Sequence, residues 1–207
     1  MENEMENGAR FASKRNNVYY RDKRVEKVFS DQARAKAEAE LLTEYRRMGA
    51  DVPLVLACRD NVIEMEFIPG ETIPDFLERM SAAPDDWETE IRKVAGYLRD
   101  WFVKFYDAVD YRRSSEIRGD VNGRNFIIAN GRAVSVDFEE RVYGTIEEDI
   151  GKLLAYIRTY DLPDGKAQRL LARVFYLLAM ESLDFLPEEM IKQYTLELAK
   201  MSERRDR

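Results

Sequence analysis

The pair Asn130-Gly131, set between two short apolar runs, is the feature that most restricts how the middle of this chain can fold. A two-residue turn of type I′ needs positive φ at both central positions, and Asn-Gly adopts this turn at the least steric cost. Pairing outward from the turn sets Ala129 opposite Arg132. The sequence therefore predicts a β-hairpin, with strands that are apolar apart from Arg132 and Ser135.

The open end of this hairpin carries oxygen-bearing side chains. Continued pairing places Asn125 opposite Val136 and beside Asp137, and Asp120 begins the loop that enters this end. Two oxygen ligands from adjacent strand ends, completed by water and phosphate oxygens, are the usual way in which Mg²⁺ is held. Asp120 or Asn125 alone would be an ordinary turn residue. The three residues at this spacing favour a metal site.

The pattern changes from strands to helices at Pro69-Gly70. Before it, strand-like runs surround one helix at residues 31–48, which Ser30 can cap and Gly49 can end. After it, helical patterns dominate apart from the hairpin. We expect an α+β fold with a disordered tail at residues 1–7, a small N-terminal antiparallel sheet with one helix at residues 8–68, and a mainly helical lobe at residues 69–207.

Composition excludes several classes of function. The chain has 207 residues and no histidine, so it contains no Ser-His-Asp or Cys-His machinery and no histidine-ligated zinc. Its net charge of −7 argues against general nucleic-acid binding. No apolar run reaches the roughly 18 residues of a membrane span, and the acidic start is not a signal peptide, so we expect a cytoplasmic protein. The single cysteine, Cys58, lies in an apolar run and is expected to be a core residue.

Two charged residues occupy apolar positions in the N-terminal part. Lys27 shares a strand face with the apolar Val25, unless the strand turns so that Val28 points inward. Glu38 lies within the apolar stripe of the helix at residues 31–48, where burial is unfavourable unless the charge is paired. Lys27 is one candidate partner, and Arg34, one helical turn earlier, is the other.

These residues resemble the motifs of the protein-kinase-like superfamily. The spacing from Asp120 to Asn125, a short hairpin and then Asp137 followed by phenylalanine is similar to its catalytic loop and metal-binding segment. Gly119 before Asp120 resembles the His-Gly-Asp form of aminoglycoside phosphotransferases, some RIO kinases and the small kinase of the KEOPS complex. The Asp-Phe-Glu ending is more similar to aminoglycoside phosphotransferases than to typical protein kinases. The runs "AEAELLTEYRRMGADVP" and "VIEMEFIPGETIPDFL" resemble the kinase of the KEOPS complex. The resemblance covers residues 18–156 and implies a bilobal protein-kinase-like fold.

The resemblance also implies roles for the residues at the centre of the site. Asp120 would be the catalytic residue, orienting an acceptor hydroxyl and accepting its proton. Asn125 and Asp137 would hold Mg²⁺, or Mn²⁺ in its place. Lys27, paired with Glu38, would hold the phosphates of ATP in register.

The resemblance also implies an adenine pocket. Val25 and Ile127 would sandwich the base, and Met65 would line the back of the pocket. The main chains of Glu66 and Ile68 would offer hydrogen bonds to the adenine. The three apolar residues of this set are equally suited to a core position. Asp149 matches the aspartate that braces the backbone of the catalytic loop in the family.

The sequence departs from the family pattern in three places. The run "ASKRNNVYY" contains no glycine where a glycine-rich phosphate loop is expected, although Lys14 or Arg15 could reach a phosphate. Arg118 stands where relatives of the His-Gly-Asp form have histidine. Glu147 follows Asp137 closely, which leaves no long activation segment and argues against a regulated eukaryotic-type protein kinase. The size best fits a compact kinase of the RIO or KEOPS type.

The resemblance thus implies an ATP- and Mg²⁺-dependent phosphotransferase that transfers the γ-phosphate to a hydroxyl, with protein serine or threonine favoured as acceptor. The implied partners are ATP and a protein substrate or complex partner. One alternative is a small-molecule kinase of the aminoglycoside-phosphotransferase type. Another is a nucleotide-binding pseudokinase that acts as an interaction module. The altered phosphate loop and Arg118 favour this last reading, whereas the complete Lys, Glu, Asp, Asn, Asp set disfavours it.

Replacing Glu38 by alanine is expected to lower turnover sharply, because Lys27 would lose the partner that holds it against the phosphates. Glu40→Ala should change turnover little, because Glu40 lies on the opposite, polar face of the same helix. Initial rates measured over a range of ATP concentrations would compare the two variants. Similar losses in both would refute the assignment of Glu38.

Overall fold

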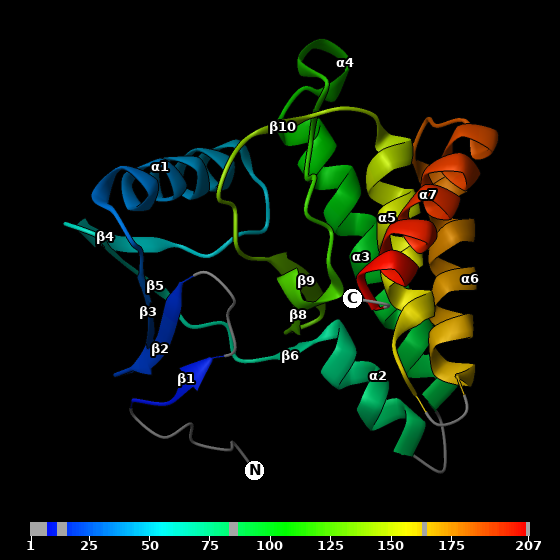
Figure 1. The fold of residues 1–207 in the computed structure, drawn as a ribbon, viewed down its shortest axis with the longest axis horizontal. Coiled ribbons are helices and arrows are strands. Elements are labelled where there is room, and N and C mark those ends of the chain that lie inside the picture. Colours follow the sequence, from blue (N-terminus) through cyan, green and yellow to red (C-terminus); the bar gives the residue numbers. More distant parts are fainter. Residues whose placement is uncertain (1–7, 12–15, 83–86, 163–164, 206–207) are drawn as a thin grey trace.

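The structure is a computed structural model that describes residues 8–11, 16–82, 87–162 and 165–205. The expected tail at residues 1–7 and the side chains of Lys14 and Arg15 lie outside the described residues. The described chain forms two lobes with a sheet and one helix in the first and mostly helices in the second (Figure 1). The predicted α+β, bilobal architecture is confirmed.

The N-terminal lobe is an antiparallel sheet with α1 packed against β4 and β5. The strands follow the order β1-β2-β3-β5-β4 across the sheet. Its elements are β1 (Arg10–Phe11), β2 (Asn17–Arg21), β3 (Arg24–Val28), α1 (Gln32–Met48), β4 (Val55–Arg59) and β5 (Val62–Glu66).

In the C-terminal lobe a small sheet in the order β6-β8-β9 packs against α2 and α3, on the side of the helices that faces the N-terminal lobe (Figure 1). Its helices are α2 (Ile73–Ala82), α3 (Trp87–Ala108), α4 (Tyr111–Ser114), α5 (Ile146–Thr159), α6 (Lys166–Ser182) and α7 (Pro187–Arg205). The remaining elements are β6 (Glu71–Thr72), β7 (Glu116–Ile117), the 3₁₀ turn η1 (Gly123–Asn125), β8 (Phe126–Ala129), β9 (Arg132–Ser135) and β10 (Val142–Tyr143). The predicted lobe boundary at residues 68–69 falls between β5 and β6, and β6 pairs with the hairpin strand β8. No helix of the described residues is long and apolar enough to cross a membrane.

The predicted hairpin is confirmed with its register. Asn130 and Gly131 have φ of 50° and 74°, as a type I′ turn requires. Ala129 lies opposite Arg132 in the β8–β9 ladder. Beyond the ladder, the amide of Val136 donates to the carbonyl of Asn125 at 2.9 Å. The open end therefore has the geometry that the turn chemistry predicts.

The start of α1 differs from the expectation by one residue. Asp31, and not Ser30, is the N-cap, because its extended backbone (φ −148°, ψ 157°) lets its side chain accept the amide of Arg34 at 3.0 Å. The end at Gly49 is as predicted. Gly49 has φ of 101°, and its amide donates to the carbonyl of Arg46 at 3.1 Å.

The expectation that Cys58 is a core residue is wrong, because its side chain is exposed. Cys58 belongs to β4, the edge strand of the sheet, in which the register shifts between Val55 and Ala57. It lines an open groove between β4 and the outer face of α1. An apolar run at a sheet edge has too little covering structure to bury all of its residues.

Asp51, in the loop between α1 and β4, joins the two lobes. Its carboxylate pairs with Arg132 at 2.9 Å and with Lys104 at 2.8 Å. Its carbonyl accepts the indole N–H of Trp101 at 2.9 Å and the amide of Ser135 at 3.0 Å. A single loop residue thus binds both α3 and the hairpin.

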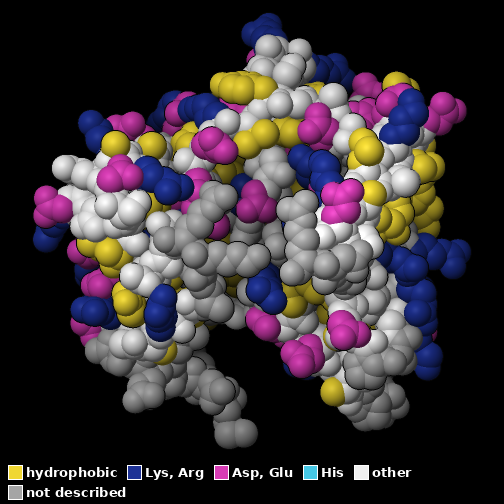
Figure 2. All heavy atoms as spheres, viewed as in Figure 1, with side chains coloured by type: hydrophobic (Ala, Val, Ile, Leu, Met, Phe, Trp, Pro, Cys, Tyr) yellow, Lys and Arg dark blue, Asp and Glu magenta, His cyan; other side chains and the backbone are white. Residues whose placement is uncertain are grey.

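In the space-filling view the surface is hollowed between the two lobes (Figure 2).

Replacing Gly49 by alanine should lower the free energy of unfolding by about 1 kcal/mol, because its left-handed backbone strains any residue with a Cβ. Gly96→Ala, within α3, should raise it by about 1 kcal/mol, because an added Cβ meets nothing within 4 Å and alanine favours the helix. Urea denaturation of both variants would measure these changes. Shifts of the same sign would contradict the assigned backbone geometry.

Candidate active site

Lys27 lies at the centre of the site, between the lobes. It is 4% exposed and extends from β3 toward α1. Its Nζ donates to the two carboxylate oxygens of Glu38 at 2.8 and 2.6 Å, and it also contacts Oδ1 of Asp137. One ammonium group therefore joins the glutamate of α1 to the aspartate after the hairpin.

The structure decides both alternatives that the sequence left open for this pair. Lys27 points inward, and Val28 is only partly buried. Glu38, which is 1% exposed, pairs with Lys27 and not with Arg34. Arg34 instead binds Oε2 of Glu139 at 2.8 Å.

The charges of this pair depend on each other. Burial alone would lower the pKa of Lys27, but the carboxylates of Glu38 and Asp137 outweigh it and raise that pKa. Burial raises the pKa of Glu38, and the attraction of Lys27 only partly opposes this change. We therefore expect the pair to be lost on the acid side, when Glu38 takes up a proton.

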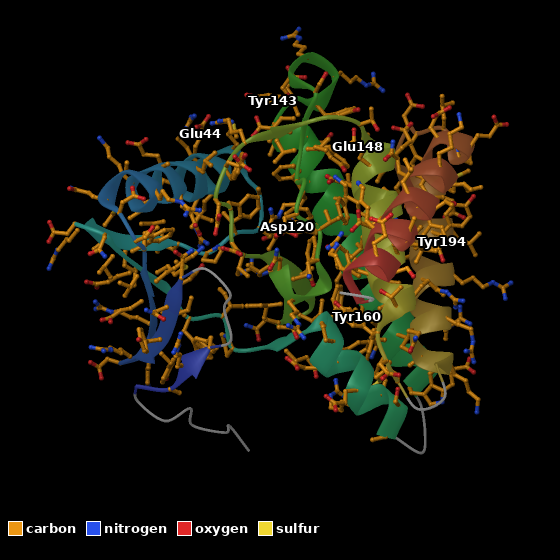
Figure 3. The ribbon with its side chains drawn as sticks, in the orientation of Figure 1. Glu44, Asp120, Tyr143, Glu148, Tyr160 and Tyr194 are labelled. Carbon is orange, nitrogen blue, oxygen red and sulfur yellow. The ribbon has the colours of Figure 1, made fainter. Side chains whose placement is uncertain are left out.

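Asp120 and Asn125 lie in the loop that leads into the hairpin. Asp120 is exposed and lies between the sheet lobe and the helical lobe (Figure 3). Its carboxylate accepts the amide of Asn122 at 3.4 Å, and its carbonyl accepts Nδ2 of Asn125 at 3.2 Å. The second bond uses the amide nitrogen of Asn125, so the amide oxygen is directed away from this loop.

The donor set fits a divalent cation that also binds a nucleotide. The side chains of Asn125 and Asp137 come from neighbouring strand ends, and Asp137 is 41% exposed while Lys27 contacts only its Oδ1. Among the described residues no group of three or more His, Cys, Asp or Glu side chains could hold a metal ion. Two oxygen ligands can hold a divalent cation when water and phosphate oxygens complete its shell. The metal-binding roles of Asn125 and Asp137 stay predictions.

Arg118 holds the backbone that follows the hairpin. Its guanidinium donates to the carbonyls of Val136 at 2.7 Å and Asp137 at 3.0 Å, and to Oγ of Ser135 at 3.0 Å. It also lies 3.9 Å from the centroid of the Phe138 ring. Asp137 has φ of 67°, which is uncommon outside glycine. The bonds from Arg118 hold this backbone in place.

Asp149 braces the catalytic loop, as the resemblance implies. Its carboxylate accepts the amides of Arg118 at 2.7 Å and Gly119 at 2.8 Å, and the hydroxyl of Tyr106 at 3.0 Å. The residue is fully buried near the start of α5. Burial raises the pKa of Asp149 to about 6, although these hydrogen bonds oppose the change.

The residues expected at the adenine lie on both sides of the gap between the lobes. Val25 and Met65 are paired across β3 and β5 in the N-terminal lobe. Ile127 of β8 packs in a small cluster with Ile68. The amide of Glu66 already donates to the carbonyl of Leu54 at 2.9 Å, so only the carbonyl of Glu66 suits an adenine donor. The roles of these residues stay predictions.

Two further hollows lie away from this cleft. One, of about 280 Å³, lies between the hairpin turn and α3, beside Asp51 and Trp101. The other is the groove of α1 and β4 that contains Cys58. Neither is lined by a residue of the predicted catalytic or metal site.

Sequence reasoning missed one charged group beside this site. Glu116 is 4% exposed and binds Arg141, and the hydroxyl of Tyr45 also donates to it. Burial and the bond to Glu116 raise the pKa of Tyr45, which keeps its hydroxyl protonated. Tyr45 lies on the buried face of α1, but nothing local in the sequence marks its partners.

The chain is similar to several known proteins. The family model of the RIO domain matches residues 4–159. The chain is 29% identical over 118 residues to a protein of Archaeoglobus fulgidus named "probable serine/threonine-protein kinase BUD32 homolog", a match that covers 57% of this chain and 51% of that relative. It therefore spans about half the length of the curated relative. A crystal structure of the ADP-bound aminoglycoside phosphotransferase APH(2'')-Ib matches 91% of this chain and 90% of its own, with 14% identity and a TM-score of 0.46.

The raised pKa of Asp149 predicts a pH-dependent contribution to stability. An unfolded aspartate has a pKa of about 3.9, so the folded state favours the protonated acid. This contribution is fully present below about pH 4 and is lost as the pH rises through about 6. Relative to Asp149→Asn, which does not titrate, the free energy of unfolding of the wild type should fall by on the order of 3 kcal/mol over this range.

Urea denaturation of both proteins at several pH values from about 4 to 7 would measure this difference. The free energy of unfolding of the wild type, relative to Asp149→Asn, should not increase with pH. If it does, the three hydrogen bonds outweigh burial, and the direction given for the pKa of Asp149 is wrong.

Proposed function

The chain belongs to the RIO domain family, and from that membership we propose that it is an ATP- and Mg²⁺-dependent phosphotransferase, an atypical kinase that transfers the γ-phosphate to a hydroxyl. The favoured acceptor is a serine or threonine of a protein. The observation that carries the proposal is the position of Lys27, which contacts Glu38 and Asp137 together. The name of the Archaeoglobus fulgidus relative supports a serine or threonine acceptor.

Lys27 and Asp137 form the part of the site that would receive the phosphates. Glu38 holds the ammonium of Lys27 on the helix side, so its charge stays directed toward the cleft. The second carboxylate oxygen of Asp137 and the amide oxygen of Asn125 would hold Mg²⁺. The chemistry that Mg²⁺ supplies when bound is neutralisation of negative charge on the phosphate oxygens.

Asp120 is the proposed base. Its exposed carboxylate can accept a hydrogen bond from an acceptor hydroxyl. It would take the proton as the hydroxyl oxygen bonds to the γ-phosphorus of ATP, while the bond from that phosphorus to the β,γ-bridging oxygen breaks and ADP leaves. The backbone of Arg118 and Gly119, immediately before it, is held by Asp149, which fixes the direction from which Asp120 approaches. Positioning of this kind supplies much of the rate in phosphoryl transfer.

The open surroundings of Asp120 support a protein acceptor over a small molecule. Only residues 138–145 separate Asp137 from the start of α5, and β10 within this segment pairs with β7. The segment is therefore held against the C-terminal lobe, and Asp120 remains accessible from solvent. A hydroxyl on a protein surface can reach such a carboxylate.

Incubation with ATP labelled at the γ-phosphate, together with Mg²⁺ or Mn²⁺, tests the proposal. We expect label on serine or threonine of a protein, either a substrate or the chain itself. Label in a small molecule would favour the aminoglycoside-phosphotransferase type of activity. Nucleotide binding without any transfer or hydrolysis would favour a pseudokinase that acts as an interaction module.

Two variants separate binding from transfer in the same assay. Asp137→Ala should abolish metal-dependent nucleotide binding, because it removes the charged ligand of the proposed metal site. Asp120→Ala should leave binding nearly unchanged and lower transfer by roughly 10²–10⁴-fold, as loss of a general base does. Asp107→Ala, an exposed position on α3, is the control. Equal loss of binding in the first two variants would mean that the roles are assigned wrongly.

A further inference from the structure

Near its first turn, helix α1 is bound to the segment that follows Asp137. Nη2 of Arg34 binds Oε2 of Glu139 at 2.8 Å, with the two side chains 44% and 19% exposed. Glu139 also accepts a bond from Nδ2 of Asn16 at 3.3 Å. Arg34 precedes Glu38 by one helical turn, so both point to the same side of α1.

The second half of α1 is tied to the same segment through Arg141. Nη1 of Arg141 donates to the two carboxylate oxygens of Glu116 at 3.0 and 2.8 Å, and its Nη2 contacts the carboxylate of Glu44. The hydroxyl of Tyr45 donates to the same buried Glu116. Glu44 and Tyr45 both belong to α1, so Arg141 and Glu116 together hold its last turns.

The segment that makes these ties is itself fixed. Val142 and Tyr143 of β10 pair with Ile117 and Glu116 of β7, so Arg141 leads directly into a strand beside its partner. Phe138 packs against the ring of Tyr45, with ring centroids 5.1 Å apart. The C-terminal lobe therefore presents Glu139 and Arg141 to α1 at set positions.

These ties lie on either side of the Lys27–Glu38 pair along the helix. A movement of α1 that separates Glu38 from Lys27 would also break the contact of Arg34 with Glu139. It would pull Glu44 from Arg141 as well. Because the helix can leave only by breaking these contacts together, the arrangement with the lysine paired is favoured over a displaced one.

We propose that Glu139 and Arg141 are positioning residues, which hold α1 so that the Lys27–Glu38 pair is assembled before nucleotide binds. This inference rests on the proposed function for its catalytic meaning. On this proposal the short segment after Asp137 supports α1 at all times. No modification of that segment is then needed to order the site. The nucleotide-free protein then already has the arrangement that phosphate binding needs.

The test uses the Arg34–Glu139 tie, because Arg141→Ala would leave Glu116 buried without its cationic partner and would endanger folding. The variants are Arg34→Ala, Glu139→Ala and the double variant. Lys36→Ala is the matched control, because Lys36 is exposed on α1 and pairs with Glu40 of the same helix, at 3.7 Å. The exchanged pair Arg34→Glu with Glu139→Arg provides the rescue.

Amide hydrogen exchange of α1 in the nucleotide-free proteins is the first measurement. We expect about tenfold faster exchange in each single variant, no further increase in the double variant, and near wild-type exchange in the exchanged pair. The control should match the wild type. Unchanged exchange in Arg34→Ala and Glu139→Ala, or an equal increase in the control, would overturn the proposal.

The second measurement is kcat and KM for ATP in the same variants. A helix held less firmly should lower kcat/KM for ATP by about tenfold, and the exchanged pair should recover most of it. The exchange measurement needs no catalysis, so it decides the support of α1 even if the wild type transfers no phosphate. Faster exchange with unaltered kcat/KM would show that the tie is structural only and would also overturn the proposal.

Discussion

A buried ammonium shared by two carboxylates is the interaction on which the rest of this structure depends. Lys27 is 4% exposed, and an unpaired charge at such a position is strongly unfavourable. Its partners come from different parts of the molecule, since Glu38 belongs to α1 and Asp137 follows the hairpin of the other lobe. The charge is tolerated only when α1, β3 and the hairpin are all in place. The geometry of the cleft is thus coupled to the packing of the two lobes.

The backbone around Asp137 is supported from the opposite side by Arg118. The resemblance to His-Gly-Asp relatives leaves open what an arginine would do in this place. Its longer side chain reaches two successive carbonyls, of Val136 and Asp137, and lies on the ring of Phe138. Asp149 in turn holds the amide of Arg118. Arg118 therefore links Asp149 to the backbone around Asp137.

The predicted protein-kinase-like superfamily is confirmed by the match of the RIO domain model to residues 4–159. The motifs that carried this prediction are short and local, and they surround the hairpin and the strand with Lys27. The motifs do not specify which residues meet across the two lobes. Asp51 binds α3 and the hairpin on one side, and Arg141 binds α1 through Glu44 on another. These contacts decide how the recognised parts are held together.

The sequence by itself determined the features that follow from neighbouring residues. Asn130-Gly131 specified the turn and its register, because few other pairs accept positive φ twice. The helical period placed Glu38 on the buried face, and Gly49 ended the helix. Local rules did not identify the N-cap of α1, because the adjacent residues Ser30 and Asp31 could both cap a helix. The extended backbone of Asp31 made it the N-cap.

Only the tertiary structure decided which charges meet and which apolar residues remain uncovered. Glu38 had two sterically reasonable partners, and the choice of Lys27 over Arg34 depended on the position of Glu139, 105 residues further along the chain than Arg34. Cys58 is exposed because β4 became the edge of the sheet, which no property of the run around it reveals. The physical reason is the same in each case. Periodicity and turn chemistry act over a few residues, whereas the pairing of a charge and the covering of a strand depend on segments that only folding brings together.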